Sequence, residues 1–531
     1  MKVSKNYILI VCLIFYGLFG SWLSINTGIS HDEYHEQLNW EINLKAIKLF
    51  FTTGDYQFLI QYKDRYHGIA FHIISQPIQF IFSNFVSNLN NVSSYGGYLI
   101  AKHIAIFLTY SISGIFFYLI CLSISKSFNF SVLSTIIYLI YPYLFGHAQI
   151  NPKDIPFLSF WIINTYFFLM ILESLYYAKQ VKIKNLIILS FLTAFLISIR
   201  TLGILIFIEY LIGVIVLLNY KKINFSNFYK IFIKLALIFL ILFLFFLYLL
   251  NPIFWHNPLE FINSIKWMAK YQQDVCTLTL GDCMRSLNLP SSYYFIWLFF
   301  KLPILIIFGY LLFPVIEKKI ISNKDQFKSI SYLTILISPI VIILTFIFKG
   351  VAVYDEIRHV MFILPMIFIV SLFNIYLFSN RFFYLCAVPV ILFLMLENLS
   401  INPYQYTWMN SFAKFTDIEK NFEIDYWGIS NKNLQKEIIK DSKTRDLDKN
   451  ICIFGNAYTK EFLNNTNFSC FKNYSEIDAE ENRPFYAYKN VRNVKRSDPK
   501  DCELIWNEGY KYTFYKKKLA QQLYGSAISF D

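Results

Sequence analysis

Hydrophobic positions in this chain fall into long uninterrupted runs and do not alternate with polar ones. A run of about 20 apolar residues is enough for a helix to cross the hydrocarbon core of a bilayer. The runs lie at 7–27, 97–121, 129–146, 156–174, 185–199, 203–219, 231–250, 293–314, 329–348, 359–378 and 382–398. The pattern predicts an all-α polytopic membrane protein with about eleven transmembrane helices.

A further apolar stretch at 68–86 is interrupted by His72 and by Gln76-Pro77. Counting it as a span would move the later lysine-rich short loops to the opposite side of the membrane, against the positive-inside rule. We therefore expect an interfacial or re-entrant helix here.

With the N-terminus inside, the lysine-rich short loops also lie inside, and the outer segments are 28–96, 147–155, 251–292, 349–358 and everything after 399. We expect residues 1–399 to form the transmembrane domain, with the chemistry in the first outer loop at 28–96. Residues 400–531 are expected to form a small extracytoplasmic α/β domain, with a helix at 431–440 and strands at 451–454, 484–491 and 510–515. The expected location is the inner membrane, with the active site facing the periplasm.

Composition agrees with a membrane protein, because 56% of residues are hydrophobic, only 16% are charged, and the mean hydropathy is +0.44. These values disfavour soluble enzymes and exclude disordered chains. Residues 400–531 carry 20 basic and 18 acidic side chains, so most of the net charge of +13 lies in the helical part. There it sets topology and does not imply nucleic-acid binding. Cys276 and Cys283 share one outer loop, where a disulfide and free thiols are both open.

The first outer loop begins with an acidic pair, Asp32 and Glu33, directly after the first helix. Neighbouring carboxylates at a membrane helix end are costly to desolvate, which favours a polar site. One of them could act as a general base, or the pair could ligate a divalent cation. A solvated loop start is the alternative.

A second outer segment, at 147–155, could bind an anion. Lys153 and Asp154 lie between Pro152 and Pro156, at the expected start of a helix, where an anion is favoured. A capping turn with a surface ion pair would look the same.

Two arginines, Arg200 and Arg358, lie at the outer ends of helices. They could clamp a phosphate or extend to lipid headgroups. The loop at 251–292 also has an amphipathic set suited to a lipid surface, namely Trp255, His256, Lys266, Trp267 and Lys270.

Read together, these segments resemble the C-type (GT-C) glycosyltransferase superfamily, and more closely the family 39 proteins related to dolichyl-phosphate-mannose–protein mannosyltransferases. The resemblance extends along most of the chain, in the right order. The matching pieces are Asp32-Glu33, Gly146-His147, Asn151-Pro152-Lys153-Asp154-Ile155-Pro156-Phe157, Ile199-Arg200-Thr201-Leu202-Gly203, Tyr354-Asp355-Glu356-Ile357-Arg358-His359, Asn402-Pro403-Tyr404-Gln405-Tyr406 and Asp425-Tyr426-Trp427-Gly428.

This resemblance implies transfer of a sugar, with inversion, from a polyprenyl-phosphate donor to a protein, lipid or glycan acceptor at the outer face. It makes Asp32 the candidate base with Glu33 as its neighbour. Lys153, Arg200, Arg358 and His359 become candidates for binding the donor phosphate. Candidate substrate contacts are His31, His147, Asn151, Asp154, Tyr404 and Tyr406. No cofactor is required, although a divalent cation could bind at Asp32 and Glu33, and no cysteine spacing is typical of zinc.

Two other functions stay open at this stage. A transporter or flippase of an amphipathic lipid would also have many helices, but transporters usually carry ionisable residues at mid-membrane and repeated halves. A membrane-anchored assembly protein would leave the carboxylates and arginines at the outer boundary without a role.

Overall fold

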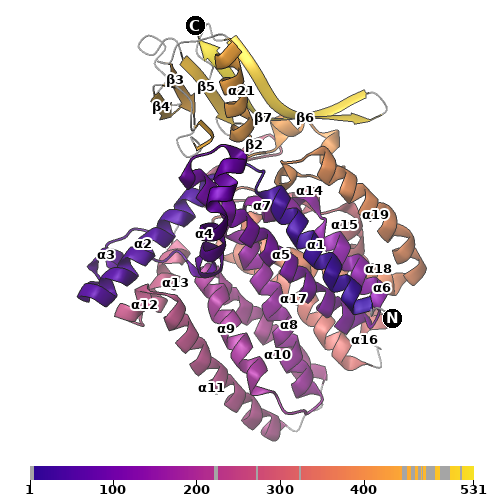
Figure 1. Ribbon diagram of the computed structural model, residues 1–531. Coiled ribbons are helices and arrows are strands. Elements are labelled where there is room, and N and C mark those ends of the chain that lie inside the picture. The colour runs from indigo at the N-terminus through magenta and orange to yellow at the C-terminus, as the bar shows by residue number, and fades with distance from the viewer. Residues whose placement is uncertain are drawn as a thin grey trace.

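The computed structural model describes residues 5–530, except for 221–224, 271–272, 322–324, 445–450, 456–460, 464–467, 469, 474–484, 491–502 and 515–516. The described residues up to 400 form a bundle of helices with one short hairpin, and a small sheet stands at one end of that bundle (Figure 1). We call this end the sheet end.

In the described part of the chain, seven helices are long and apolar enough to cross a membrane. These are α5 (Ser94–Ser125), α8 (Asp154–Tyr176), η1 with α10 (Thr201–Leu205 and Ile206–Tyr220), α11 (Phe225–Leu250), α17 (Gln326–Lys349), η3 with α18 (Arg358–Ile363 and Leu364–Phe378) and α19 (Asn380–Ser400). The protein is therefore a multi-pass membrane protein.

Two predicted spans are broken helices. The run at 129–146 divides into α6 (Phe128–Leu139) and α7 (Pro142–Ile150), which meet at 59°. The run at 293–314 divides into α14 (Ser292–Lys301) and α15 (Ile304–Leu311), followed by α16 (Phe313–Ile321). Pro142 and Pro303 lie at the breaks, and proline removes a backbone donor and disfavours helical geometry in the residue before it.

Two other predicted spans, α1 (Lys5–Ser24) and α9 (Ile183–Ile199), are apolar helices whose described apolar parts are shorter than a full crossing. Counting the bent pair α6–α7 as one span raises the total to eight.

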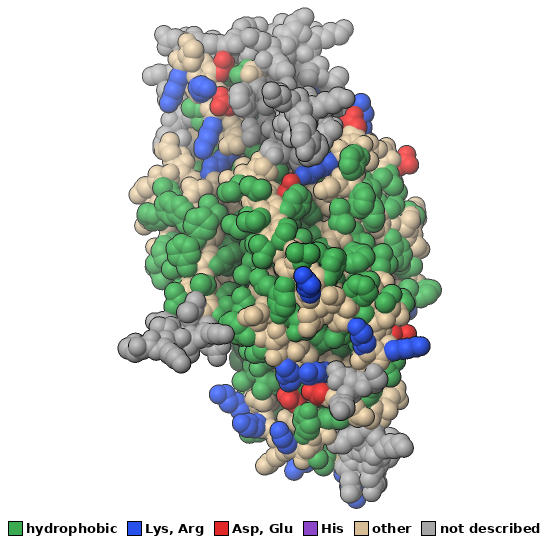
Figure 2. Space-filling view, turned by 90° about the vertical axis from the view of Figure 1, so that its right-hand side faces the viewer, with side chains coloured by type: hydrophobic (Ala, Val, Ile, Leu, Met, Phe, Trp, Pro, Cys, Tyr) green, Lys and Arg blue, Asp and Glu red, His purple; other side chains and the backbone are tan. Residues whose placement is uncertain are grey.

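Hydrophobic side chains form a broad belt on the face shown in Figure 2. Lysine and arginine side chains gather below the belt, and others lie on the sheet end (Figure 2). The positive-inside rule counts basic residues in short loops between spans, so it predicts that the end below the belt faces inward.

The segment predicted as the first outer loop, 28–96, is mostly helical and lies at the sheet end. It contains α2 (His31–Thr53), α3 (Gln57–Ile60) and α4 (Ala70–Asn90). The expected interfacial helix at 68–86 corresponds to α4, which packs along α5 and is not among the candidate spans of the described chain. A side chain at Gly97 on α5 would lie 2.5 Å from Ser87 on α4, so glycine permits this close packing.

The later outer loop at 251–292 holds α12 (Ile253–His256), α13 (Glu260–Lys270), a hairpin of β1 (Cys276–Thr279) and β2 (Asp282–Arg285), and η2 (Ser286–Asn288). A disulfide joins Cys276 to Cys283 across the hairpin.

After α19 the chain runs through η4 (Gln405–Thr407), η5 (Ala413–Phe415) and α20 (Ile418–Asn421) to α21 (Asn431–Thr444) and a five-stranded sheet. The strands are β3 (Cys452–Gly455), β4 (Cys470–Asn473), β5 (Phe485–Asn490), β6 (Glu503–Phe514) and β7 (Lys517–Phe530), in the order β4-β3-β5-β7-β6.

The pairs made by β3 are parallel, and those made by β7 are antiparallel. A second disulfide links Cys452 and Cys470. The predicted fold class, helical membrane protein with a C-terminal α/β region, is confirmed. The outer residues of the strand predicted at 484–491 lie outside the described residues.

Candidate functional site

Asp32 and Glu33 lie at the start of α2, and their side chains point into different surroundings, because successive side chains on a helix point in different directions. Glu33 closes a capping box with Ser30: its carboxylate accepts a hydrogen bond from the Ser30 backbone N–H at 2.6 Å. Its other oxygen lies 2.9 Å from Nε2 of His103 on α5, and the side chain is fully buried. The Asp32 side chain is 36% exposed. Only Asp32 of the pair is therefore open to a substrate.

Arg358, at the start of η3, lies within 4 Å of carboxylates from three chain segments. Its guanidinium donates to Asp32 at 2.6 Å, lies 3.0 Å from Asp355, and lies 3.9 Å from Asp154. The rings of Tyr354 and Trp427 lie 5.1 and 5.5 Å from it. Such a buried, aromatic-flanked arginine fixes the position of Asp32.

The turn before α8 supplies the next part of the site. Asn151 Oδ1 accepts hydrogen bonds from the backbone of Lys153 and Asp154, at 3.1 and 2.8 Å. Its amide donates to Asp154 Oδ2 at 3.0 Å and reaches Nδ1 of His147 at 3.1 Å. A turn at this position was the alternative that the sequence left open, but Asp154 does not form the surface ion pair of that alternative. It is buried, and its carboxylate faces Arg200 and Arg358.

Arg200 and His359 complete the group around Asp154. Arg200 donates to Asp154 Oδ1, and its other terminal nitrogen lies 3.3 Å from Nδ1 of His359. Asp32, Asp154, Arg200, Arg358 and His359 thus form one cluster, which we call the central cluster.

A second cluster lies beside the central one and is joined to it by Lys153. Lys153 Nζ donates to Glu36 at 2.6 Å and lies 3.4 Å from Nδ1 of His67. Its charge also acts on Asp32. His35 lies on the same side, with Nδ1 4.0 Å from Glu36.

The electrostatics favour an ionised Asp32. Burial raises the pKa of Asp32, but the charge and hydrogen bond of Arg358, with His31 and Lys153, outweigh it and hold the pKa below its ordinary value. His67 behaves oppositely, since burial and then the nearby Lys153 lower its pKa well below the usual range. At neutral pH the site offers a carboxylate and neutral imidazole.

The remaining predicted substrate contacts lie behind the central cluster. The His147 ring meets Trp427 at 5.0 Å, Tyr406 donates to Asp425, and the Tyr404 hydroxyl accepts from Asn433 at 2.9 Å. The backbone N–H of His31 donates a hydrogen bond to the carbonyl oxygen of Trp427 at 3.3 Å, so His31 contacts the same group of residues.

Gly146 permits the close packing of α7 against the Tyr406 backbone, because the Cβ of any other residue there would lie 2.0 Å from the Tyr406 backbone nitrogen. Sequence reasoning did not select Glu36, Asp355 or Trp427 as site residues. The spacing of Asp355 three residues before Arg358 was the available signal.

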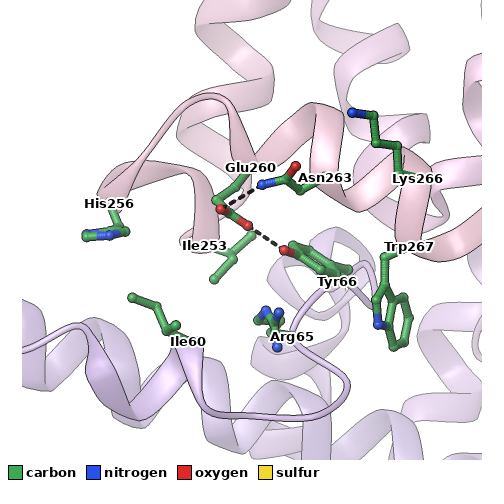
Figure 3. A pocket seen from close by; sticks show the side chains of 9 residues that line it. All are labelled: Ile60, Arg65, Tyr66, Ile253, His256, Glu260, Asn263, Lys266 and Trp267. Carbon is green, nitrogen blue, oxygen red and sulfur yellow. Dashed lines mark hydrogen bonds between the residues drawn. The ribbon is translucent and has the colours of Figure 1, made fainter.

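A pocket of about 450 Å³ is lined in part by Trp267 (Figure 3), whose ring centroid lies 6.1 Å from that of His67. Arg65 and Tyr66 line one side, and the Glu260 carboxylate accepts hydrogen bonds from Tyr66 and, at 3.0 Å, from Asn263. The other lining residues are Ile60, Ile253, His256, Lys266 and Trp267. Three members of the predicted amphipathic set thus line one pocket; the side chain of Lys270 lies outside the described part.

The chain matches no protein-family model and no curated protein. Among solved structures it is similar to ArnT from Cupriavidus metallidurans in the apo state, with 10% identity, a TM-score of 0.47, and coverage of 99% of this chain and 98% of that one. The same protein bound to undecaprenyl phosphate gives 10% identity, a TM-score of 0.46 and the same coverage. At these values the likeness does not establish a shared function, and the superfamily and family 39 assignments stay predictions.

Proposed function

We propose that this protein is an integral-membrane glycosyltransferase that moves a sugar from a polyprenyl-phosphate donor to a protein, lipid or glycan acceptor. The observation that carries the proposal is the central cluster. A partly exposed, ionised carboxylate, Asp32, lies at one end of a membrane helix bundle, with Arg358, Arg200 and Lys153 around it. We propose that this end faces the periplasm, across the inner membrane.

The chemistry needs a base and a stabilised leaving group. In the proposed step, Asp32 takes the proton of the acceptor hydroxyl. The acceptor oxygen forms a bond to the anomeric carbon on the face opposite the phosphate, so the configuration inverts. The bond from that carbon to the phosphate oxygen breaks, and its electron pair leaves with the polyprenyl phosphate.

Cations must meet the charge that develops on the phosphate. Arg200, Arg358 and Lys153 are proposed for this duty, and all three contact carboxylates. His359 is proposed to bind the phosphate as a neutral hydrogen-bonding imidazole beside Arg200. A phosphate has to compete with Asp154 for Arg200 and with Glu36 for Lys153. Lys153 is the most adaptable of them, because a flexible lysine stem can move between partners.

We propose that the polyprenyl-phosphate carrier binds in the pocket shown in Figure 3. Arg65 and Lys266 supply positive charge, while Ile60, Ile253 and Trp267 supply apolar surface. A polyprenyl phosphate has both kinds of group, and ligand sites commonly combine an apolar lining with a few polar groups.

One observation keeps the lipid transporter as a second candidate. Glu209 is fully buried within α10, and its carboxylate accepts a hydrogen bond from Trp161 at 2.8 Å. Ionisable groups inside a membrane span often serve transport pathways.

Product analysis tests the proposal directly. Purified protein in lipid nanodiscs is incubated with polyprenyl-phosphate sugars carrying a radiolabel, together with membrane extracts as acceptor, and products are identified by mass spectrometry. We expect label to leave the lipid and appear in a glycosylated acceptor. Movement of intact labelled lipid across proteoliposome membranes, with no transfer to any acceptor, would instead support the transporter.

The ion pair between Arg358 and Asp32 sets how activity depends on pH. Because Asp32 acts as a base only when deprotonated, its low pKa keeps wild-type transfer active in mild acid. Arg358→Gln removes the strongest of the effects that oppose burial and so raises the pKa of Asp32. Transfer at pH 5 relative to pH 7.5 is therefore expected to fall several-fold in Arg358→Gln, but not in Arg358→Lys. A ratio unchanged in Arg358→Gln would mean that Asp32 does not limit the acidic limb.

A further inference from the structure

The second cluster, beside Lys153, contains three side chains with the chemistry of a metal site. One ligand atom each from His35, Glu36 and His67 can be chosen so that all three atoms lie within 4.8 Å of one another. We propose that these three residues bind a divalent transition-metal ion of the zinc type. This site is distinct from the Asp32-Glu33 pair, whose carboxylates have separate surroundings.

The fold brings the three ligands together from two segments. His35 and Glu36 are consecutive on α2, and His67 lies in the loop before α4. The two imidazole rings meet edge to face, with centroids 5.1 Å apart and planes at 84°. Glu36 is buried, so its carboxylate is held in place between them.

A fourth side chain orients the imidazoles. Asp64 Oδ2 lies 3.2 Å from Nε2 of His35, and its Oδ1 lies 3.8 Å from Nε2 of His67. Metal-binding histidines commonly pair their second ring nitrogen with a carboxylate in this way. The Nδ1 atoms are then left toward Glu36, where Nδ1 of His35 also touches the Asn39 amide at 3.4 Å.

Two imidazoles with one carboxylate select the kind of ion. This set suits zinc and similar ions with one open coordination position, whereas calcium and magnesium prefer oxygen ligands. Ligand atoms around tetrahedral zinc lie about 3.3 Å apart, given bonds of about 2.0–2.1 Å. The side chains therefore need to close by about 1.5 Å from their present spacing, which rotamer changes can supply.

Lys153 lies in this cluster in the structure described here. Its ammonium donates to Glu36 at 2.6 Å and approaches Nδ1 of His67 at 3.4 Å. A cation bound to those same atoms repels the ammonium and takes its acceptors. The ion and Lys153 therefore compete, and metal binding releases Lys153 toward the central cluster.

The test measures metal binding by the full-length protein. Purified chelator-treated protein, prepared without a histidine tag, is dialysed against ZnCl₂, and bound zinc is counted by mass spectrometry. We expect one zinc per chain, and at least about tenfold weaker binding in Glu36→Gln and His67→Ala, since each loses a ligand. His256→Ala, which removes a histidine outside the cluster, should bind zinc as wild type does.

Lys153→Met gives the more decisive comparison, because it is expected to increase zinc affinity, whereas the two ligand variants decrease it. Removing the competing charge should tighten zinc binding by about tenfold. Loss of fold cannot produce a tighter site. Equal zinc affinity in wild type, Glu36→Gln and His67→Ala would overturn the site, and unchanged affinity in Lys153→Met would overturn the competition. The measurement requires no sugar donor, so its outcome is independent of the proposed transferase activity.

Discussion

Asp32→Asn is expected to slow sugar transfer by about 10²- to 10⁴-fold, the range that a positioned general base contributes. The asparagine amide keeps the size of the carboxylate but cannot accept the acceptor proton. Because Asp32 is partly exposed at the start of α2, the change should leave the helix intact. The measurement is the initial rate of label transfer from a polyprenyl-phosphate sugar to acceptor, per mole of protein.

Two comparisons make this result specific. Asp55→Asn changes an exposed carboxylate in the same outer loop, just beyond α2, and should leave the rate unchanged. A thermal-shift titration of Asp32→Asn with polyprenyl phosphate should still show stabilisation by the ligand, which separates lost chemistry from lost binding. Transfer within about threefold of wild type would be too small a loss for a general base and would remove Asp32 from that role.

The site shows why sequence order predicts the members of the central cluster better than their pairing. Asp32 and Arg358 were both expected at the outer ends of helices, yet 326 positions separate them, and only the packed bundle joins them. Asp154 was expected at a helix start and turns out to face both arginines. The predicted membrane topology places these polar residues at the same depth along the membrane normal, but it does not predict which of them are in contact.

The role of Glu33 could have been predicted from a local capping pattern, but the interpretation of Asp32 and Glu33 as a catalytic pair concealed it. Ser30 followed three residues later by Glu33 is a capping box, which assigns the carboxylate to the helix start. Reading the two acidic residues as a pair hid this assignment. The helix breaks at Pro142 and Pro303 were likewise visible in the sequence, but the apolar runs across them carried more weight in the prediction.

The ion pair between Lys301 and Glu356 could not be predicted, because one partner lies within an apolar run and the other in a distant loop. The pair has an N–O distance of 2.7 Å, and both side chains are fully buried. The Lys301 ammonium also lies 4.8 Å from the Tyr143 ring and 5.6 Å from the Trp297 ring. Removing one member of such a pair leaves a buried charge without compensation.

Lys301→Met is expected to destabilise the protein most in alkaline solution, by up to about 3–5 kcal/mol, the usual effect of breaking a buried pair. Burial raises the pKa of Glu356 to about 8, with Lys301 opposing the rise. Without Lys301 that pKa rises further, so above pH 8 the folded variant keeps a proton on Glu356 that folded wild type releases. In that range the folded variant binds more protons than folded wild type, and its stability relative to wild type falls as pH increases.

The penalty of Lys301→Met should therefore be smaller near pH 5 and larger near pH 9.5, growing by up to about 1.4 kcal/mol per pH unit above pH 8. Heat denaturation of full-length wild type and variant in one detergent, followed at both pH values, measures the penalty as a shift in the unfolding midpoint. Lys301→Met with Glu356→Gln removes both charges and should recover much of the loss at pH 9.5 and lose the pH dependence of the penalty. A penalty of the same size at both pH values would mean that Lys301 does not lower the pKa of Glu356.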